Sequence, residues 1–366
     1  MPSFLGQLRG NEIFASDYNM IISQEVNAEN IAAGYGSLVE RARVDGGLYG
    51  DTKLFYETDA LSSKAWTGDN EAANLLAVER PADPACQAIV IDTFRIVAVT
   101  VDSYLTKRMW VDEGSFSSFN GVILGWLSVT KKVYDETTYN AFIGTDITSV
   151  GQQSLTVSLA PVNSAATTGD EEAEARIRAQ KLAEYMSNLL FKLRRPTRDY
   201  NDLQFLRSYG PKDLTVVWNS KYVSEIKKVD LPTIFGADRV EAGLFDEENI
   251  LPEEYFGAVN SSATAGDGST VRSLVEQVIT TGGVDHHYFA GDLILVGDTA
   301  PAGSSYTQSG KIICKVIGKL PPYMSGFVTG TSFYNNRALL ENHYLIWSHN
   351  SLEHFVGKPF ITIEEA

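Results

Sequence analysis

The front of the chain cannot form a hydrophobic core on its own. Residues 1–45 carry isolated apolar side chains among polar ones, with no sustained helical or strand period. A second polar stretch, residues 59–86, separates two short β-type runs at 52–56 and 88–101. Loops of that length are uncommon inside compact domains and are usually functional. We therefore expect both polar segments to pack on something outside their own domain.

The composition excludes several classes of protein. A chain of 366 residues can bury a sizeable core without disulfides, and Cys86 and Cys314 fit neither a disulfide framework nor a zinc motif. The 46 acidic and 30 basic residues give a net charge of −16, which argues against sequence-independent DNA binding. No apolar run is long enough to span a bilayer. Residues 1–10 lack the basic and apolar regions of a signal peptide, so we expect the chain to stay where it is made.

The longest helical pattern lies between Asp112 or Ser115 at its start and Gly144 at its end. Its apolar residues recur at spacings of three, four, seven and eight, which predicts one helix of nearly thirty residues. The positions are Phe116, Phe119, Ile123, Trp126, Val133 and Ala141. At 1.5 Å per residue, this helix would be about 40 Å long, as long as a small domain is wide.

A second helix is marked at both ends. Thr168 and Glu171 form a capping box, and Pro196 ends the pattern. Between them a continuous apolar stripe predicts that one face packs against a core. The stripe consists of Ala179, Leu182, Ala183, Met186, Leu189, Leu190 and Leu193. Basic side chains between positions 192 and 195 complement the negative end of the helix dipole.

The remainder of the chain is rich in β-type sequence. Residues 214–218 read as a buried strand, Asn219 as the N-cap of a short helix, and residues 269–281 as a third helix. Further strands are expected at 293–296, 311–316, 338–347 and 360–363. Because this order lacks the regular alternation of strand and helix that a parallel sheet requires, the fold class we expect is α+β.

No catalytic template fits the sequence. The histidines match no metal-ligand spacing, and we expect them at the surface or in interfaces. They are His286, His287, His343, His349 and His354. The acidic cluster from Asp246 to Glu254 is interpreted as a solvated loop, and the helix dipole accounts for most of the basic cluster from Lys192 to Arg198. We therefore expect no catalytic, cofactor-binding or metal-binding residues, and this pattern favours a structural role.

Several segments follow one another in a characteristic order. An irregular N-terminal arm precedes a long two-stranded excursion, and a long helix follows Trp110-Val111-Asp112-Glu113. The segment from Leu214 to Ile226 is a strand that ends in Asn and leads into a short helix, and it comes after an amphipathic helix. The chain then ends in strands between Leu345 and Ile363. In this layout the sequence resembles the major capsid proteins of tailed bacteriophages, which share the HK97-type fold.

The resemblance implies a division of the chain into the parts of an HK97-like capsid fold. Residues 1–45 would form the N-terminal arm and residues 46–110 an extended β loop. Residues 111–165 and 331–366 would form a peripheral domain that contains the long spine helix. Residues 166–330 would form the axial domain.

The resemblance also implies a function and a set of partners. Copies of the chain would assemble into hexamers and pentamers of an icosahedral phage head that encloses double-stranded DNA without sequence-specific binding. Assembly would take place in the cytoplasm of the host bacterium, and the final location would be the virion. The other partners would be a portal protein and a separate scaffolding protein, because no prominent coiled-coil segment precedes the arm. The resemblance implies no enzymatic activity, no cofactor and no membrane.

Apolar side chains within the two polar segments are the expected contacts between subunits. They are Phe4, Leu5, Ile13 and Phe14 in the arm, and Trp66, Leu75 and Leu76 in the loop. Such segments can become ordered by wrapping neighbouring copies, in interfaces above about 2,000 Å². Some members of the family join a loop lysine covalently to an asparagine of another subunit with the help of a glutamate. Lys64 is the only lysine at the tip of the excursion and is the candidate here.

Two other functions remain open on the sequence alone. An encapsulin-like compartment would keep the same fold and enclose cargo protein in place of DNA. A soluble hydrolase would use carboxylates of the acidic loop, with Glu247 and Glu253 as the residues to neutralise in a test.

Overall fold

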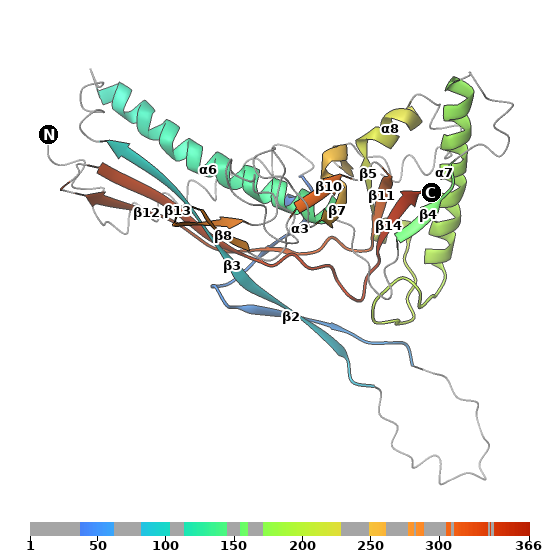
Figure 1. Cartoon of the computed structure of the whole chain (residues 1–366). Coiled ribbons are helices and arrows are strands. Elements are labelled where there is room, and N and C mark those ends of the chain that lie inside the picture. Colours follow the sequence, from blue (N-terminus) through green and yellow to red (C-terminus); the bar gives the residue numbers. More distant parts are fainter. Residues whose placement is uncertain are drawn as a thin grey trace, which may run out of the picture.

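The computed structural model describes most of the chain between residues 37 and 366. The described ranges are 37–61, 82–102, 113–144, 154–159, 171–227, 249–260, 277–281, 283–288, 305–308, 311–335, 337 and 340–366. They form two five-stranded sheets with helices packed on them and two two-stranded sheets, and one long helix extends over the sheet with the longer strands (Figure 1).

The sheet with the longer strands, which we call the long sheet, has the order β1-β12-β13-β3-β2. Its strands are β1 (Arg43–Asp45), β12 (Tyr323–Asn335), β13 (Leu340–Asn350), β3 (Ala85–Asp102) and β2 (Thr52–Glu57). β1 pairs with β12 in parallel, and the other pairs are antiparallel. Helix α6 (Glu113–Gly144) lies along one face, where Leu127 packs with Leu345 and Trp347 (Figure 1).

The second sheet, which we call the compact sheet, has the order β4-β14-β11-β5-β6. Its strands are β4 (Ser154–Val157), β14 (Phe360–Glu365), β11 (Ile312–Ile317), β5 (Thr215–Asn219) and β6 (Ile250–Leu251). One face packs against α7 (Glu171–Arg194) and α8 (Ser220–Lys227). The other face packs against α3 (Leu38–Ala42) and the C-terminal end of α6, so every residue of β11 is buried.

Short elements complete the described part of the chain. They are the 3₁₀ turns η1 (Pro211–Asp213) and η3 (Glu253–Tyr255) and the strand pairs β7 (Gly257–Asn260) with β10 (Ser305–Gln308) and β8 (Gln277–Thr281) with β9 (Val284–Tyr288). Helix α6 ends against η3 at Gly144, where a Cβ atom would lie 1.7 Å from the carbonyl oxygen of Tyr255. Only glycine fits this contact between two backbones.

Local sequence signals explain several boundaries. The backbone N–H of Lys221 donates to the side-chain oxygen of Asn219 at 3.0 Å, which confirms Asn219 as the N-cap of α8. Helix α7 ends at Arg194, just before Pro196, and most of its predicted apolar stripe is buried against the compact sheet. Thr168, the other half of the predicted capping box, lies outside the described residues.

A buried polar cluster joins α6 to the long sheet. Asp135 of α6 accepts hydrogen bonds from the Lys131 ammonium and the Tyr323 hydroxyl, both at 2.5 Å. Arg43 of β1 approaches the same carboxylate at 3.3 Å. Asp135 and Lys131 are almost fully buried, so the pairing offsets the cost of removing both charges from water. The cluster fixes how the helix sits on the sheet.

Most of the expected strands and helices are confirmed within one to four residues. They are the strands β2, β3, β5, β11, β13 and β14 and the helices α6, α7 and α8. The strand expected at 293–296 lies outside the described residues. The arrangement is α+β, as expected.

The helix expected over residues 269–281 is wrong for its described part. Residues 277–281 form strand β8, which pairs with β9 in a tight hairpin. Val278, Ile279 and Thr280 are β-branched, and Gly283 in the turn has a φ of +83°. A Gly-Gly pair that follows a β-branched run and precedes Val284 is a hairpin signal, and it outweighs the weak helical spacing of this segment.

Several regular segments were not expected, among them the short strands β4, β6, β7, β9 and β10 and two longer regions. Strand β12 reads as turn sequence because Gly326 and Gly330 interrupt it, and its pairing with β13 supplies the stability that its own propensity lacks. The end of the presumed arm was expected to lack regular structure, and this is wrong for α3 and β1. Leu38, Val39 and Ala42 are buried among residues of α6 and the compact sheet.

Candidate assembly surfaces

One face of the long sheet has no element covering it among the described residues. Odd-numbered side chains of β3 face inward, and even-numbered ones are exposed. The register puts exposed positions of β2 and β12 on the same face, because Leu54 lies opposite Ala88 and Phe333 opposite Asn342. The large apolar residues of this surface, which we call the open face, are Leu54, Tyr56, Val90, Phe94, Ile96 and Phe333.

The outer side of α6 carries a second exposed apolar surface. Val122, Trp126, Val129 and Val133 follow one another at spacings of four, three and four, so they line one side of the helix. Trp126 is 64% exposed. This surface, which we call the outer stripe, contains Trp126 and Val133, two of the apolar residues whose spacing predicted the helix. The side of the helix that packs on its own core includes Leu127 and the residues from Thr138 to Ile143.

The two surfaces lie on opposite sides of one layer. α6 packs on odd-numbered residues of β3, such as Val97 and Val99, whereas the open face is made by even-numbered ones. Soluble monomers rarely expose large contiguous apolar patches, and such patches mark sites of association. The layer can therefore contact other molecules on both sides.

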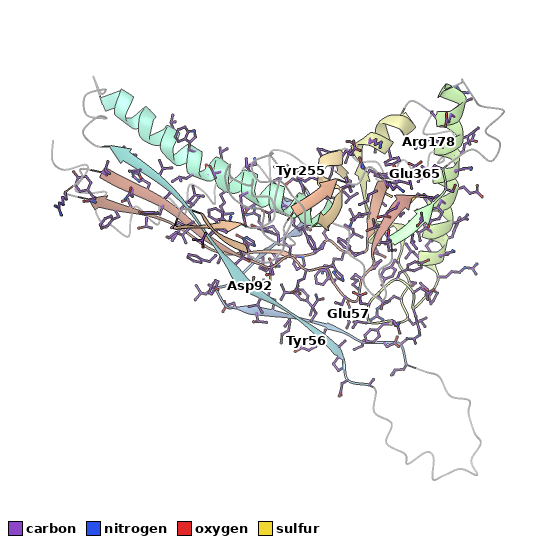
Figure 2. The ribbon with its side chains drawn as sticks, in the orientation of Figure 1. Tyr56, Glu57, Asp92, Arg178, Tyr255 and Glu365 are labelled. Carbon is purple, nitrogen blue, oxygen red and sulfur yellow. The ribbon has the colours of Figure 1, made fainter. Side chains whose placement is uncertain are left out.

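Polar contacts join the hairpin of β2 and β3 to the rest of the molecule near its far end, where Tyr56 and Glu57 lie (Figure 2). Glu57 pairs with Arg207 at 3.0 Å and with Lys358 at 3.2 Å. Asp59 accepts hydrogen bonds from Arg198 at 2.7 Å and from the backbone N–H of Leu206 at 2.8 Å. We call this set of contacts the far-end contacts.

The electrostatics of the far-end contacts favour the ionised carboxylate of Asp59. The backbone hydrogen bond from Leu206 and the hydrogen bond from Arg198 lower the pKa of Asp59 to about 2. Asp59 is therefore charged throughout the range in which the protein would be handled. The same clustering explains Arg198, the member of the basic cluster that the helix dipole left unexplained, because it pairs with Asp59.

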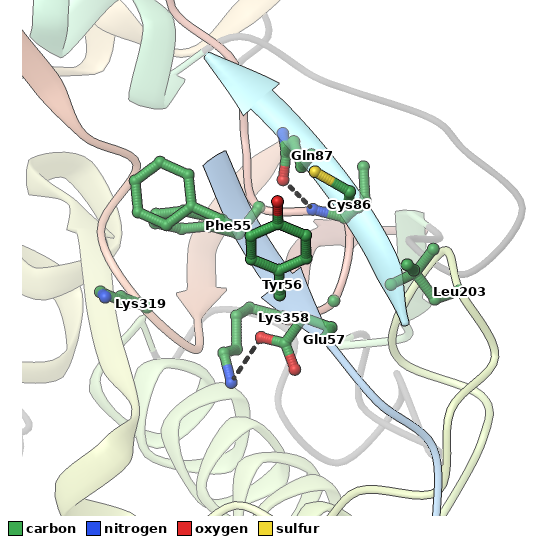
Figure 3. Close-up of a pocket in the computed structure, with 12 residues that line it drawn as sticks. Phe55, Tyr56, Glu57, Cys86, Gln87, Leu203, Lys319 and Lys358 are labelled. Carbon is green, nitrogen blue, oxygen red and sulfur yellow. Dashed lines mark hydrogen bonds and ion pairs between the residues drawn. The ribbon is translucent and has the colours of Figure 1, made fainter. Parts of the chain in front are cut away.

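A pocket of about 310 Å³ lies beneath the hairpin, beside the far-end contacts (Figure 3). Phe55, Leu203 and Phe355 give it apolar walls, and Lys319 and Lys358 contribute ammonium groups. The Glu57–Lys358 ion pair crosses this region (Figure 3). The hairpin therefore rests on the body with incomplete packing, and polar contacts supply part of its attachment.

The contact residues predicted from the sequence all lie outside the described residues. They are Phe4, Leu5, Ile13 and Phe14 of the arm and Trp66, Leu75 and Leu76 of the loop, together with Lys64. The residues that sequence reasoning missed are those of the open face. Their signal was present in β3, since residues of both parities from Ile89 to Val101 are apolar although one face of the strand is open.

Several of the histidines and carboxylates considered for chemistry have structural partners. His349 is fully buried, which corrects its expected place at a surface or interface, and His354 pairs with Asp202 at 2.8 Å. Glu253 of the acidic loop lies 3.6 Å from Lys221, and positions 246–248 lie outside the described residues. In the described part of the chain, no cluster of three or more ligating side chains could hold a metal ion.

The cysteines and helices add two observations. Cys86 is exposed on the hairpin and Cys314 is buried in β11, and both thiols are free. Burial raises the pKa of the Cys314 thiol well above its ordinary value, so that it is unreactive. Of the helices within the described ranges, none combines the length and the apolar character needed to cross a bilayer.

Comparison with solved structures identifies the fold. No protein-family model matches the sequence, and no curated protein matches it either. A chain from the capsid structure of Staphylococcus phage Andhra matches with a TM-score of 0.57 at 11% identity, over 89% of this chain and 83% of that one. The fold is that of a phage capsid protein. A chain from the structure of head fiber and inner core protein gp22 of native bacteriophage P68 matches with a TM-score of 0.54 at 12% identity, over 87% and 86% of the two chains.

This likeness confirms the resemblance inferred from the order of segments. It is a likeness of fold, because identities of 11% and 12% leave few positions at which a residue role could be carried over. The two exposed apolar surfaces are therefore the observations on this chain that bear on what it does.

Proposed function

We propose that this chain is the structural subunit of a tailed-phage head, which self-assembles into hexamers and pentamers of an icosahedral shell around double-stranded DNA. One observation carries the proposal: a phage capsid fold exposes apolar surfaces on both sides of its long layer. In an assembled shell, neighbouring copies would bury these surfaces. Weak contacts of this kind, repeated by symmetry, make a particle far more stable than any one contact.

Each part of the chain has a role in this proposal. Helix α6 would be the spine helix of a peripheral domain made of residues 111–165 and 331–366, and residues 166–330 would form the axial domain. Residues 46–110 would form the extended loop, whose described part includes β2 and β3. The arm, residues 1–45, and the tip of the loop would cross to neighbouring copies through their apolar side chains.

The proposal also specifies partners and location. The subunit would be non-enzymatic, would assemble in the host cytoplasm with a separate scaffolding protein and a portal protein, and would end in the virion. Packaged DNA would be enclosed without sequence-specific contacts, consistent with a net charge of −16.

Electron microscopy and sedimentation of the purified full chain test the proposal. The expected result is closed shells or their capsomers, with added scaffolding protein where the chain alone does not close. A chain that remains a monomer at every concentration, with or without scaffold, would contradict the proposal. Nucleic acid recovered from particles purified from infected cells would separate a phage head from a compartment that encloses cargo protein.

Removing the first 20 residues tests the role of the arm. We expect closed particles to disappear while the helical signal in circular dichroism stays near that of the full chain, because the described packing of α6 and α7 is against residues from position 38 onward. Intact shells formed by the truncated chain would show that the arm is not needed.

A further inference from the structure

The hairpin of β2 and β3 projects beyond the strand that supports it. β13 pairs with β3 from Asp102 to Ile91, and from Val90 to Ala85 the only described partner of β3 is β2. A β-bulge lies at this transition, where Asp92 accepts hydrogen bonds of 2.7 Å from both the backbone N–H and the hydroxyl of Ser351. Bulges bend strands, so this is the place at which the direction of the hairpin is set.

The body-facing side of the hairpin changes from apolar to charged along its length. Nearest the bulge, Ile89 and Ile91 are buried with Met324 and Phe355. Phe55 follows, with its ring centroid 5.0 Å from that of Phe355. Gln87 lies opposite Phe55, and beyond this pair, towards the free end, the inward side chains are Glu57 and Asp59. Apolar packing therefore holds the near part, whereas hydrogen bonds and ion pairs hold the far part.

The polar contacts of the far part are numerous and directed. The Gln87 amide donates to the carbonyl of His354 at 2.9 Å and accepts from the N–H of Val356 at 3.2 Å. Glu57 and Asp59 form ion pairs with Arg198 and Arg207 in one loop and with Lys358 in another. The Arg207 guanidinium also donates to the carbonyl of Thr58. Contacts from several directions restrict the hairpin more than a single exposed ion pair would.

The segments that receive these contacts are themselves fixed. Residues 197 and 207 form a β-bridge, and the side chain of Asn201, which is fully buried, bonds to both the N–H and the carbonyl of Phe205. The backbone N–H of Asp202 donates to the carbonyl of Val356 at 2.9 Å, which joins this loop to residues 354–358. The body therefore presents a preformed receptor for the hairpin.

We propose that Glu57 and Asp59 are positioning residues that latch the far half of the hairpin to the body and so aim its open face at a neighbouring copy. The near half, packed by Ile89 and Ile91, acts as the fixed base. The pocket beneath Phe55 and Glu57 leaves room for the hairpin to change its angle when the latch is released. The inference rests on the proposed function for its consequence in assembly, but the latch itself is a property of one subunit.

A distance measurement on the unassembled full chain tests the latch directly. One spin label goes on Cys86, which is exposed on the hairpin, and a second on Glu184→Cys, an exposed position of α7. Cys314 is buried and stays unlabelled. We expect one narrow distance distribution, and a broadened or shifted one in the variant that combines Glu57→Gln with Asp59→Asn. Identical distributions in the two proteins would overturn the proposal.

Assembly kinetics supply the second readout. Each exposed ion pair shifts the equilibrium between the latched and the released hairpin by a factor of about one to five. The latch contains three ion pairs, so its loss should lower the fraction of correctly aimed hairpins, and with it the rate of shell formation, about tenfold. The matched control is Lys221→Gln, which removes an exposed ion pair with Glu253 far from the hairpin. The control should assemble like the unchanged protein, and all three proteins should melt at similar temperatures. A double variant that assembles at the normal rate would contradict the role of the latch in assembly.

Salt separates the latch from the apolar contacts between copies. At 1 M salt the Debye length is about 3 Å, so the ion pairs weaken while apolar association does not. We expect the unchanged protein and the double variant to converge in both label distance and assembly rate. A partner exchange, Asp59→Arg with Arg198→Asp, should recover part of the narrow distance distribution at low salt. Failure of the unchanged protein to assemble at all would refute the proposed function but not the latch, since the distance measurement needs no shell.

Discussion

The compact sheet and the long sheet use similar apolar residues but bury them differently. In the compact sheet both faces are covered within one subunit, so that each residue of β11 and the side chain of Trp218 are inaccessible to water. In the long sheet α6 covers one face, whereas Ile96 on the other is 56% exposed. The compact sheet therefore stabilises the single subunit, and the open face of the long sheet can gain stability only from another molecule.

Two tryptophans give the largest expected contrast. Trp218→Ala should lower the free energy of unfolding of the subunit by about 3–5 kcal/mol, because it leaves a large cavity in a covered core. Trp126→Ala should change it by less than about 0.5 kcal/mol, because that side chain is exposed, and should instead weaken assembly. Denaturant titration of the unassembled subunits and sedimentation of the assembled ones measure the two effects. Equal losses of subunit stability would break the comparison.

Acid should weaken the packing of α6 on the long sheet. Burial lowers the pKa of His349 to about 4, and the positive charges of Arg95 and Lys131 lower it further. The hydrogen bond to the carbonyl of Asn350 and the charge of Asp135 raise the pKa, but they do not outweigh burial. The carbonyl can only accept, so Nδ1 carries the proton and Nε2 accepts from the Tyr134 hydroxyl at 3.0 Å. The side chain is thus held neutral, with the Tyr323 ring stacked beside it.

The direction of the pH effect on stability follows from comparing proton binding in the folded and the unfolded chain. Between pH 6.5 and pH 4 the unfolded chain binds a proton at His349 that the folded chain does not, so stability falls as the pH falls through this window, by about 3 kcal/mol in all. Denaturant titrations at several pH values should show this slope, and His349→Gln should reduce it. An unchanged slope in the variant would mean that other groups cause the acid sensitivity.

Adjacent residues of β3 test the two faces of the long sheet with the same substitution. Val97→Asp places a charge against α6 and should destabilise the subunit by about 2 kcal/mol or more. Ile96→Asp, one residue away, should cost less than about 0.5 kcal/mol in the subunit but raise the concentration needed for assembly by about tenfold. Unfolding of the Ile96→Asp subunit, or its normal assembly, would contradict the assignment of the open face.

The smallest effect is expected at a surface contact of the compact sheet. Arg178 of α7 and Glu365 of β14 lie together (Figure 2), with N–O distances of 2.8 and 3.1 Å. Burial raises the pKa of Glu365, but hydrogen bonds from Tyr222 and Arg178 outweigh burial and lower it overall. Glu365→Gln should therefore destabilise the subunit by about 0.5–1 kcal/mol at neutral pH, and the difference should vanish as acid protonates the native carboxyl. A larger loss would contradict our inference that the covered core, and not surface contacts such as this one, supplies most of the stability of the subunit.

Sequence reasoning predicted the elements whose signals are local. β5 and β11 are mostly apolar runs of β-type residues, Asn219 is an N-cap, and α7 has an apolar stripe that stops before Pro196, so each could be assigned from its own residues. β12 could not, because its glycines suggest turns until pairing with β13 is known. β8 was taken for a helix because short apolar runs fit both periods.

The candidate surfaces were harder to predict for a related reason. The spacing of α6 predicts an apolar helix, but Trp126 and Leu127 are equally apolar and only packing shows which of the two faces the sheet. β3 poses the same question, since Ile96 and Val97 differ in exposure and not in character. The contacts at Glu57 and Asp59 join residues about 140–300 positions apart, which no local pattern reveals.

Oxidative footprinting of the two tryptophans, in assembled particles and in dissociated subunits, tests the central claim most directly. Trp126 should be oxidised readily in the subunit and be protected in the particle, because a neighbouring copy covers the outer stripe. Trp218 should be protected in both states, because its own subunit already buries it. Equal oxidation of Trp126 in particles and subunits would contradict the claim that the exposed apolar surfaces exist to be covered by other copies.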